Sequence, residues 1–288
     1  MARRRILTAA TVLLVLGLLT TVALTNPWSG RSSSANAGVK SGLLWAADME
    51  TGDLDQWSSQ DGGGVYTTGT YTVDASKQRA HSGNYSLRAV ITAPSASGVR
   101  AFRWKELRQY QELYVGAWFY IPTTYQQTAD PCCGRYWDLF QFKSRTPGSS
   151  NVRIDPFWLF SADQAADGQY YLRAGWGWGG VTVPGPYGNS PLGGKNYTQR
   201  IAPVPVGRWT HIEAFIRQSS GYDGALILWQ DGVKLFDFQN IRTSYTNCDY
   251  NDWCADGEWS VNSYSDGLSP SPSTLYVDDA AISTQHVR

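Results

Sequence analysis

Strong helix formers are scarce in this chain of 288 residues, which contains only five Glu, six Lys and two Met. This scarcity argues against a fold built from amphipathic helices. Glycine, in contrast, occurs 29 times, proline 13 times, tryptophan 13 times and tyrosine 17 times. Aromatic residues favour strands, and Gly and Pro favour the turns between strands, so the composition predicts an all-β protein.

An excess of one charge is also missing. The chain has 24 Lys and Arg against 24 Asp and Glu, and its one basic block is Arg3–Arg5. Proteins that bind nucleic acid neutralise phosphates with clustered cations. The sequence therefore predicts no nucleic-acid partner.

Cysteine is rare, with four residues at Cys132, Cys133, Cys248 and Cys254. Four cysteines fit an oxidising compartment and allow three disulfide pairings, among which the sequence does not choose. A zinc site is the alternative, but the spacing lacks the usual CX2C pair and no histidine is close.

The N-terminus decides the expected compartment. After the arginines of Met1–Arg5, the run Ile6–Thr25 is mostly apolar, so residues 1–27 are predicted to be an export signal. The run is long enough to span a bilayer, so cleavage of a signal peptide and retention as a membrane anchor both remain open. Residues 28–42 form a Ser/Gly-rich tether. Either way, the remaining chain is expected outside the cytoplasm, secreted or at the cell surface.

Residues 43–288 have the length of one large all-β domain, which we expect to be monomeric. Apolar and polar residues alternate with period two in several segments, and Asp231-Gly232 between two of them predicts a hairpin. About a dozen short strands are typical of a two-sheet antiparallel jelly-roll sandwich with a concave groove. The clearest predicted strands are Tyr85–Thr92, Leu113–Ile121, Tyr136–Lys143, Tyr170–Ala174, Trp209–Arg217, Ala225–Trp229, Val233–Phe238 and Ser273–Ser283.

The order of six segments makes Leu43–Ser283 resemble a known fold family. These segments are Ala46–Trp57, His81–Leu87, Tyr114–Pro122, Gly207–Glu213, Leu228–Gly232 and Tyr276–Ile282. Together they resemble the concanavalin-A-like lectin/glucanase jelly roll and, within it, the polysaccharide lyases of the heparin-lyase and alginate-lyase type. The resemblance implies an extracellular polysaccharide as partner and cleavage of a uronic-acid polymer by β-elimination.

The lyases that the chain resembles use a Gln and a His on one groove strand, with a Tyr from a neighbouring strand. Gln141 is similar to that Gln, and Lys143 stands in place of the His. Tyr264 is similar to the Tyr, but Ser260 replaces the Lys that precedes it in alginate lyases. The resemblance thus implies a site with two positions kept and two altered.

The family's Arg-containing segment resembles Trp104–Arg108. Its first Arg position is occupied by Trp104, with Arg103 adjacent and Arg108 at the end. By the resemblance, Arg103 belongs to the catalytic residues and Arg108 binds substrate.

β-Elimination needs a group that neutralises the substrate carboxylate, a base and an acid. Gln141, Lys143 and the arginines suit the first role, and Tyr264 the other two if nearby cations lower its pKa. Alternation puts Gln141 and Lys143 opposite Phe140 and Phe142. The competing hypotheses are a non-catalytic carbohydrate-binding or adhesion module and a purely structural surface module.

His211 shares one face of its predicted strand with Glu213. The two form either an acid–base unit, with Glu213 near the substrate, or a partly buried histidine held by a carboxylate. A retaining glycoside hydrolase is not expected, because the Glu-x-Asp-x-x-Glu strand of jelly-roll glucanases does not occur.

Trp176 and Trp178 lie in a glycine-rich segment where no core requires them. Exposed rings of this kind either stack on sugars or hold loops against the sandwich.

Glu50 and Asp53 lie in the segment Ala46–Trp57, near an expected first strand, and Asp278 lies in the last predicted strand, Ser273–Ser283. If those strands pair, their oxygens suit a structural Ca²⁺ ion, although solvated carboxylates or turn caps remain the alternative. The sequence implies no required cofactor.

Overall fold

The computed structural model describes residues 42–93, 98–107, 110–128, 135–145, 154–176, 184–185, 188–189, 196–244 and 257–287. Two short 3-10 helices, Asp55–Trp57 and Ser59–Asp61, interrupt a chain that is otherwise built from strands and loops in this part. The strands are β1 (Leu43–Ala47), β2 (Gly63–Thr68), β3 (Tyr71–Ser76), β4 (Ser86–Ile91), β5 (Val99–Glu106), β6 (Glu112–Tyr120), β7 (Gln126–Gln127), β8 (Asp138–Arg145), β9 (Ile154–Gln164), β10 (Tyr170–Trp176), β11 (Pro184–Gly185), β12 (Gly188–Asn189), β13 (Asn196–Val204), β14 (Trp209–Arg217), β15 (Gly224–Gln230), β16 (Val233–Ile241), β17 (Glu258–Ser265), β18 (Leu268–Ser269) and β19 (Ser273–Ser283).

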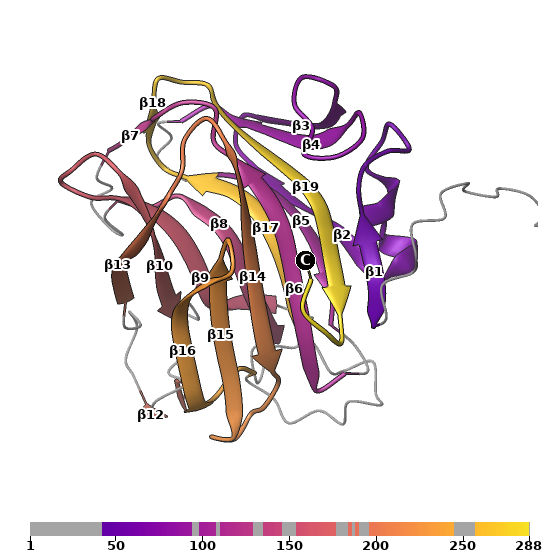
Figure 1. The fold of residues 1–288 in the computed structure, drawn as a ribbon, viewed down its shortest axis with the longest axis vertical. Helices are drawn as coiled ribbons and strands as arrows, with labels where there is room; N and C mark the ends of the chain where they lie inside the picture. The colour runs from indigo at the N-terminus through magenta and orange to yellow at the C-terminus, as the bar shows by residue number, and fades with distance from the viewer. Residues whose placement is uncertain are drawn as a thin grey trace, which may run out of the picture. The chain divides into compact units, whose positions relative to one another are not determined.

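Two large antiparallel sheets form a sandwich (Figure 1). The eight-stranded sheet has the order β16-β15-β14-β6-β19-β4-β3, with β1 pairing with β19. The seven-stranded sheet has the order β13-β10-β9-β8-β17-β5-β2. Because most neighbours in each sheet are far apart in sequence, the predicted all-β antiparallel sandwich of jelly-roll type is confirmed.

Period-two alternation positions the side chains as expected in β14. Ile212, Ala214 and Ile216 are buried in the core, and the alternate residues of the strand face away from it. The predicted hairpin also forms, because β15 and β16 pair through Asp231 and Gly232. Both turn residues have positive φ, 49° and 79°, as a tight two-residue hairpin turn requires.

Aromatic rings fill the space between the sheets. Trp158 and Trp259 of the seven-stranded sheet are fully buried. The ring centroid of Phe140, in the same sheet, lies 6.5 Å from that of Phe119 in the eight-stranded sheet. Each sheet therefore has one face that packs against the other and one face directed away from the core.

The predicted signal and tether, residues 1–42, lie outside the described residues except for Gly42, and so do all four cysteines. Within the described ranges, no helix is long and apolar enough to cross a membrane.

Candidate functional site

The outward face of the seven-stranded sheet carries most of the polar residues that the lyase hypothesis needs. In β17, Trp259 and Val261 belong to the core, so Ser260, Asn262 and Tyr264 face outward. In β5, the same alternation turns Arg100, Phe102, Trp104 and Glu106 outward.

One line of residues crosses this sheet from edge to edge, because each is the register partner of the next. We call it the transverse row. It places an arginine next to a tyrosine, the tyrosine next to a carboxylate, and a second arginine beyond an intervening serine. The transverse row consists of Thr68, Arg100, Tyr264, Asp138, Ser161, Arg173 and Thr198.

Tyr264 is held between a cation and a second tyrosine. Arg100 Nη2 donates to the Tyr264 hydroxyl oxygen over 2.8 Å, and Arg100 Nη1 donates to Thr68 Oγ1 over 3.2 Å. The Tyr136 ring meets the Tyr264 ring edge-on at 5.0 Å. Burial raises the pKa of Tyr264, although Tyr136 and Arg100 act in the opposite direction. Tyr264 is therefore protonated at neutral pH and suits the role of a proton donor.

Asp138 is a carboxyl group that titrates near neutrality. It is 5% exposed and accepts a hydrogen bond from the Ser161 hydroxyl. Burial raises its pKa to about 7, although Ser161 and the charge of Arg173 act in the opposite direction. A carboxylate with such a pKa can take and release a proton at physiological pH.

Arg173 anchors the other half of the transverse row. Its Nε lies 2.6 Å from an Asp163 carboxylate oxygen, and its Nη1 donates to Asn196 Oδ1 over 2.5 Å. Burial raises the pKa of Asp163 to about 6 even though Arg173 acts in the opposite direction. The site thus has two arginines, one on each side of the Tyr264–Asp138 pair.

Next to the transverse row lies a second group of polar side chains, which we call the unpaired cluster: Gln141, Ser260 and Asn262. Gln141 and Ser260 are register partners and are fully buried, and Asn262 is 2% exposed. Within the described part of the chain, both amide atoms of Gln141 and Asn262 and the hydroxyl of Ser260 lack a hydrogen-bond partner. Buried polar atoms are nearly always satisfied, so five unpaired atoms in one cluster are unusual, even though the protein itself covers them.

Of the five predicted catalytic residues, the fold brings three to this face: Gln141, Lys143 and Tyr264. The Lys143 ammonium lies 5.0 Å from the Phe102 ring centroid. Arg103 lies on the opposite face of β5, which it shares with the core residue Ala101. There it is 9% exposed, and burial lowers its pKa. Arg108 lies outside the described residues.

His211 and Glu213 belong to the eight-stranded sheet and do not share a surface with Tyr264. The Glu213 carboxylate lies 3.0 Å from His286 Nδ1 and accepts a hydrogen bond from the backbone N–H of Val287. The His211 ring lies 5.1 Å from that of Trp118. Glu213 therefore holds the C-terminal segment in place, and these two residues stand apart from the transverse row.

The other predicted site residues are the two tryptophans, Trp176 and Trp178, and the expected calcium ligands. Trp176 ends β10, but its side chain and all of Trp178 lie outside what the structure describes. Among the described residues, no three His, Cys, Asp or Glu side chains gather so that they could hold a metal. The expected calcium ligands accept backbone N–H hydrogen bonds, from Asn84 and Tyr85 to Glu50, from Asp55 to Asp53, and from His81 and Ser82 to Asp278.

Sequence reasoning missed Arg100, Asp138 and Arg173. Strict alternation places Asp138 on the core side together with Phe140, but the ladder between β8 and β9 shifts register between these two residues. The irregularity turns Asp138 outward, and no sequence signal marks it.

Comparisons with known proteins agree with this fold. No curated protein sequence matches the chain. The structure is similar to the endo-β-1,4-glucuronan lyase from the fungus Trichoderma reesei, with a TM-score of 0.60 and 17% identity over 84% of this chain and 96% of that one. It is also similar to a mutant of the alginate lyase Aly36B in complex with an alginate trisaccharide, with a TM-score of 0.53 and 14% identity over 85% and 99% of the two chains. At these identities the likeness concerns the fold alone. The family model described as polysaccharide lyase matches residues 49–278, so the chain belongs to the polysaccharide lyase family.

Proposed function

We propose that this polysaccharide lyase cleaves a uronate-containing polymer by β-elimination on the outward face of its seven-stranded sheet. The observation that carries the proposal is the transverse row, in which the proton donor Tyr264 and the carboxyl group of Asp138 are register partners. Arg100 and Arg173 flank this pair. An acid, a base and two cations thus lie side by side without any rearrangement of the backbone.

The reaction divides among the residues as follows. The unpaired amides of Gln141 and Asn262 bind the substrate carboxylate, which makes the proton on the adjacent α carbon more acidic. The Asp138 carboxylate removes this proton, and the released electron pair forms the double bond to the β carbon. The glycosidic oxygen leaves the β carbon with its bonding pair and takes the hydroxyl proton of Tyr264.

Arg100 has a defined part in this scheme. Because it donates to the hydroxyl oxygen of Tyr264, it stabilises the tyrosinate that remains after proton transfer. The proton on Asp138 then returns to Tyr264, its neighbour in the row, and both groups are restored. Tyr264 therefore acts as the acid, and Asp138 takes the role of base that the sequence assigned to the tyrosine.

The substrate class rests on Arg100 and Lys143, which can face substrate carboxylates. The same face also carries carboxyl groups, because Arg173 is paired with Asp163 and Lys143 is the register partner of Glu258. The two similar structures are a glucuronan lyase and an alginate lyase, which supports a uronate rather than a neutral glycan. The predicted export segment, residues 1–27, supports action outside the cytoplasm.

The test uses the purified full-length protein with polyglucuronate, alginate and a neutral glucan. Cleavage by β-elimination produces an unsaturated uronate, which is followed by its ultraviolet absorbance and by the new vinyl proton in NMR spectra. We expect this product from at least one uronate polymer and none from the glucan. Retention of uronate polymers without any product would overturn the lyase proposal and leave a carbohydrate-binding module.

A further inference from the structure

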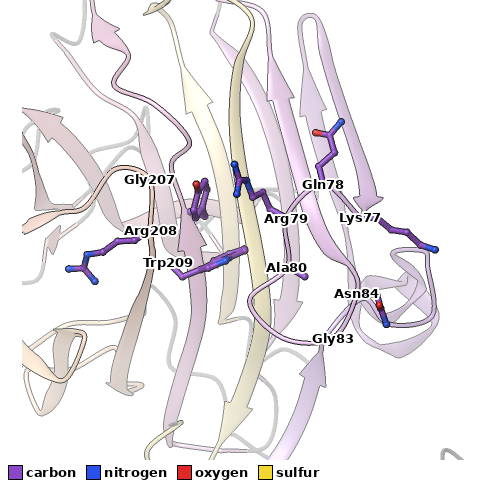
Figure 2. A pocket seen from close by; sticks show the side chains of 10 residues that line it. Lys77, Gln78, Arg79, Ala80, Gly83, Asn84, Gly207, Arg208 and Trp209 are labelled. Atoms are coloured by element: carbon purple, nitrogen blue, oxygen red, sulfur yellow. The ribbon is translucent and has the colours of Figure 1, made fainter.

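A pocket with a volume of ≈ 730 Å³ opens on the eight-stranded sheet. It lies between the segment that joins β3 to β4 and the residues that lead into β14 (Figure 2). Its lining includes Lys77, Arg79, Asn84, Tyr120, Arg208 and Trp209. We propose that this pocket binds a uronate residue of the polysaccharide and is a binding site separate from the transverse row. The identity of the ligand rests on the proposed function.

The charge of the pocket favours an anion. Three cations line it, and none of its ten lining residues is acidic. Among the described residues, no carboxylate forms an ion pair with Lys77 or Arg79. Arg208 Nη1 lies 3.5 Å from Asp231, and its side chain is 64% exposed, so this contact holds it only weakly.

Arg79 is oriented by stacking rather than by an ion pair. Its guanidinium carbon lies 5.1 Å from the centroid of the Tyr120 ring. A stacked guanidinium uses its flat face and keeps its N–H groups at the edge, where they can donate to a carboxylate. Figure 2 shows Arg79 and Trp209 pointing toward the middle of the pocket, whereas Lys77 and Arg208 lie at opposite sides and extend away from it.

Aromatic rings supply the second half of a sugar site. The half-buried Trp209 ring lies 5.4 Å from that of Tyr120, which is 7% exposed and lies under the Arg79 guanidinium, so Trp209 is the ring that a sugar can reach. The apolar face of a pyranose ring packs on such surfaces. The Gln78 oxygen accepts a hydrogen bond from Tyr276 at 2.8 Å, which leaves its NH₂ group for sugar hydroxyls. Cations, a ring and an amide together favour an acidic sugar over an inorganic anion.

The pocket and the transverse row lie on different sheets, so one polymer segment can occupy the pocket while another is cleaved. Such a site holds the enzyme on its substrate and raises the local concentration of cleavable bonds. It therefore matters for long polymers and not for short oligosaccharides.

Affinity electrophoresis tests the proposal in full-length protein that carries Tyr264→Phe to prevent cleavage. Gels contain polyglucuronate, alginate or a neutral glucan. The pocket variant is Arg79→Gln with Arg208→Gln. The matched control is Arg217→Gln with Lys234→Gln, which removes the same charge from the same sheet at cations paired with Glu112 and Asp237. We expect the pocket variant to bind a uronate polymer about tenfold more weakly and the control to bind like the parent.

Trp209→Phe and Trp209→Ala separate ring stacking from folding. We expect the phenylalanine variant to keep most of the binding and the alanine variant to lose it, with near-parental circular dichroism for both. Equal retardation of the pocket variant, the control and the parent in the uronate gels overturns the proposal. If the pocket variant loses as much retardation in the neutral glucan gel as in the uronate gels, the assignment to an acidic sugar is overturned.

Cleavage assays with Tyr264 restored distinguish the pocket from the catalytic proposal. We expect the pocket variant to cleave a uronate tetrasaccharide at the parental rate and the polymer more slowly. If the parent cleaves no uronate polymer, the proposed lyase reaction fails, and the gels still decide whether the pocket binds uronates.

Discussion

The Arg100 guanidinium donates to the hydroxyl oxygen of Tyr264 over 2.8 Å. Because the oxygen accepts this hydrogen bond, the tyrosine's own proton points elsewhere and can be donated. The same contact would stabilise the oxygen after the proton has left. Tyr264 is thus arranged as a proton donor, with Arg100 as its counter-cation.

Tyr264→Phe removes that proton and leaves the ring. We expect the rate of uronate cleavage to fall by about 10²–10⁴, as for the loss of other general acids. The unfolding free energy should change little, because the ring contacts with Phe102 and Tyr136 remain. Tyr66→Phe on the same sheet is the control, since Tyr66 is 47% exposed, and it should keep its activity. A Tyr264→Phe enzyme with parental activity would remove this residue from the mechanism.

Two arginines of one strand have opposite expected roles. Arg100→Met should abolish most of the activity, because the tyrosinate loses its counter-cation. Arg103→Met should retain activity and leave the unfolding free energy unchanged or higher, since it replaces a buried cation by an apolar side chain of similar length. Steady-state cleavage rates and denaturant unfolding of both variants check this. Loss of activity in Arg103→Met with its fold intact would return that residue to the site.

The sequence was sufficient for the fold and for part of the site. In β14 and β19 the alternation of apolar and polar residues is clear, and the predicted segments Trp209–Arg217 and Ser273–Ser283 coincide with the strands. The strands β1, β2, β3, β5, β9, β13 and β17 were not among the predicted segments, nor were the two-residue strands β7, β11, β12 and β18. In β5, Arg103 and Lys105 sit on the inner side where alternation calls for apolar residues, so the pattern is masked.

The site itself depends on register, which no single segment encodes. Asp138 and Tyr264 meet because ladder shifts occur between Asp138 and Phe140 and between Val261 and Tyr264. Composition and spacing contain no mark of either shift. The resemblance to polysaccharide lyases supplied Tyr264 and Gln141, whereas Arg100 and Asp138 needed the three-dimensional pairing.

The pH dependence of cleavage should report the Asp138 carboxyl. A base must be deprotonated, so the rate should rise with pH until it passes the pKa of about 7. Ser161→Ala removes a hydrogen bond that stabilises the carboxylate, and the rise should therefore move to higher pH. Asp138→Asn should lose most of the activity together with the rise. Rate profiles across neutral pH measure both effects, and an unmoved profile in Ser161→Ala would contradict the assignment.

Stability should respond to pH through the same carboxyl. The folded state holds a proton on Asp138 up to about pH 7, whereas an unfolded Asp releases it near pH 3.9. Between these values the folded state binds more protons, so the unfolding free energy falls as the pH rises, by a few kcal/mol at most. Asp163, with a pKa of about 6, contributes with the same sign. Denaturant unfolding of the parent and Asp138→Asn at several pH values should show a shallower fall in the variant. Parallel curves would mean that Asp138 titrates normally.

Two buried glutamines separate a ligand-binding amide from a structural one. Gln141 is fully buried with both amide atoms unpaired, so Gln141→Leu should leave the unfolding free energy unchanged or raise it by about 1–2 kcal/mol. Gln218, which is 3% exposed, donates to the carbonyls of Leu107 and Tyr110, and Gln218→Leu should lower it by about 1–3 kcal/mol. Cleavage should show the reverse order, with activity lost in Gln141→Leu and kept in the folded fraction of Gln218→Leu. If Gln141→Leu destabilises the protein as much as Gln218→Leu and still cleaves, the Gln141 amide supports the sheet rather than the substrate.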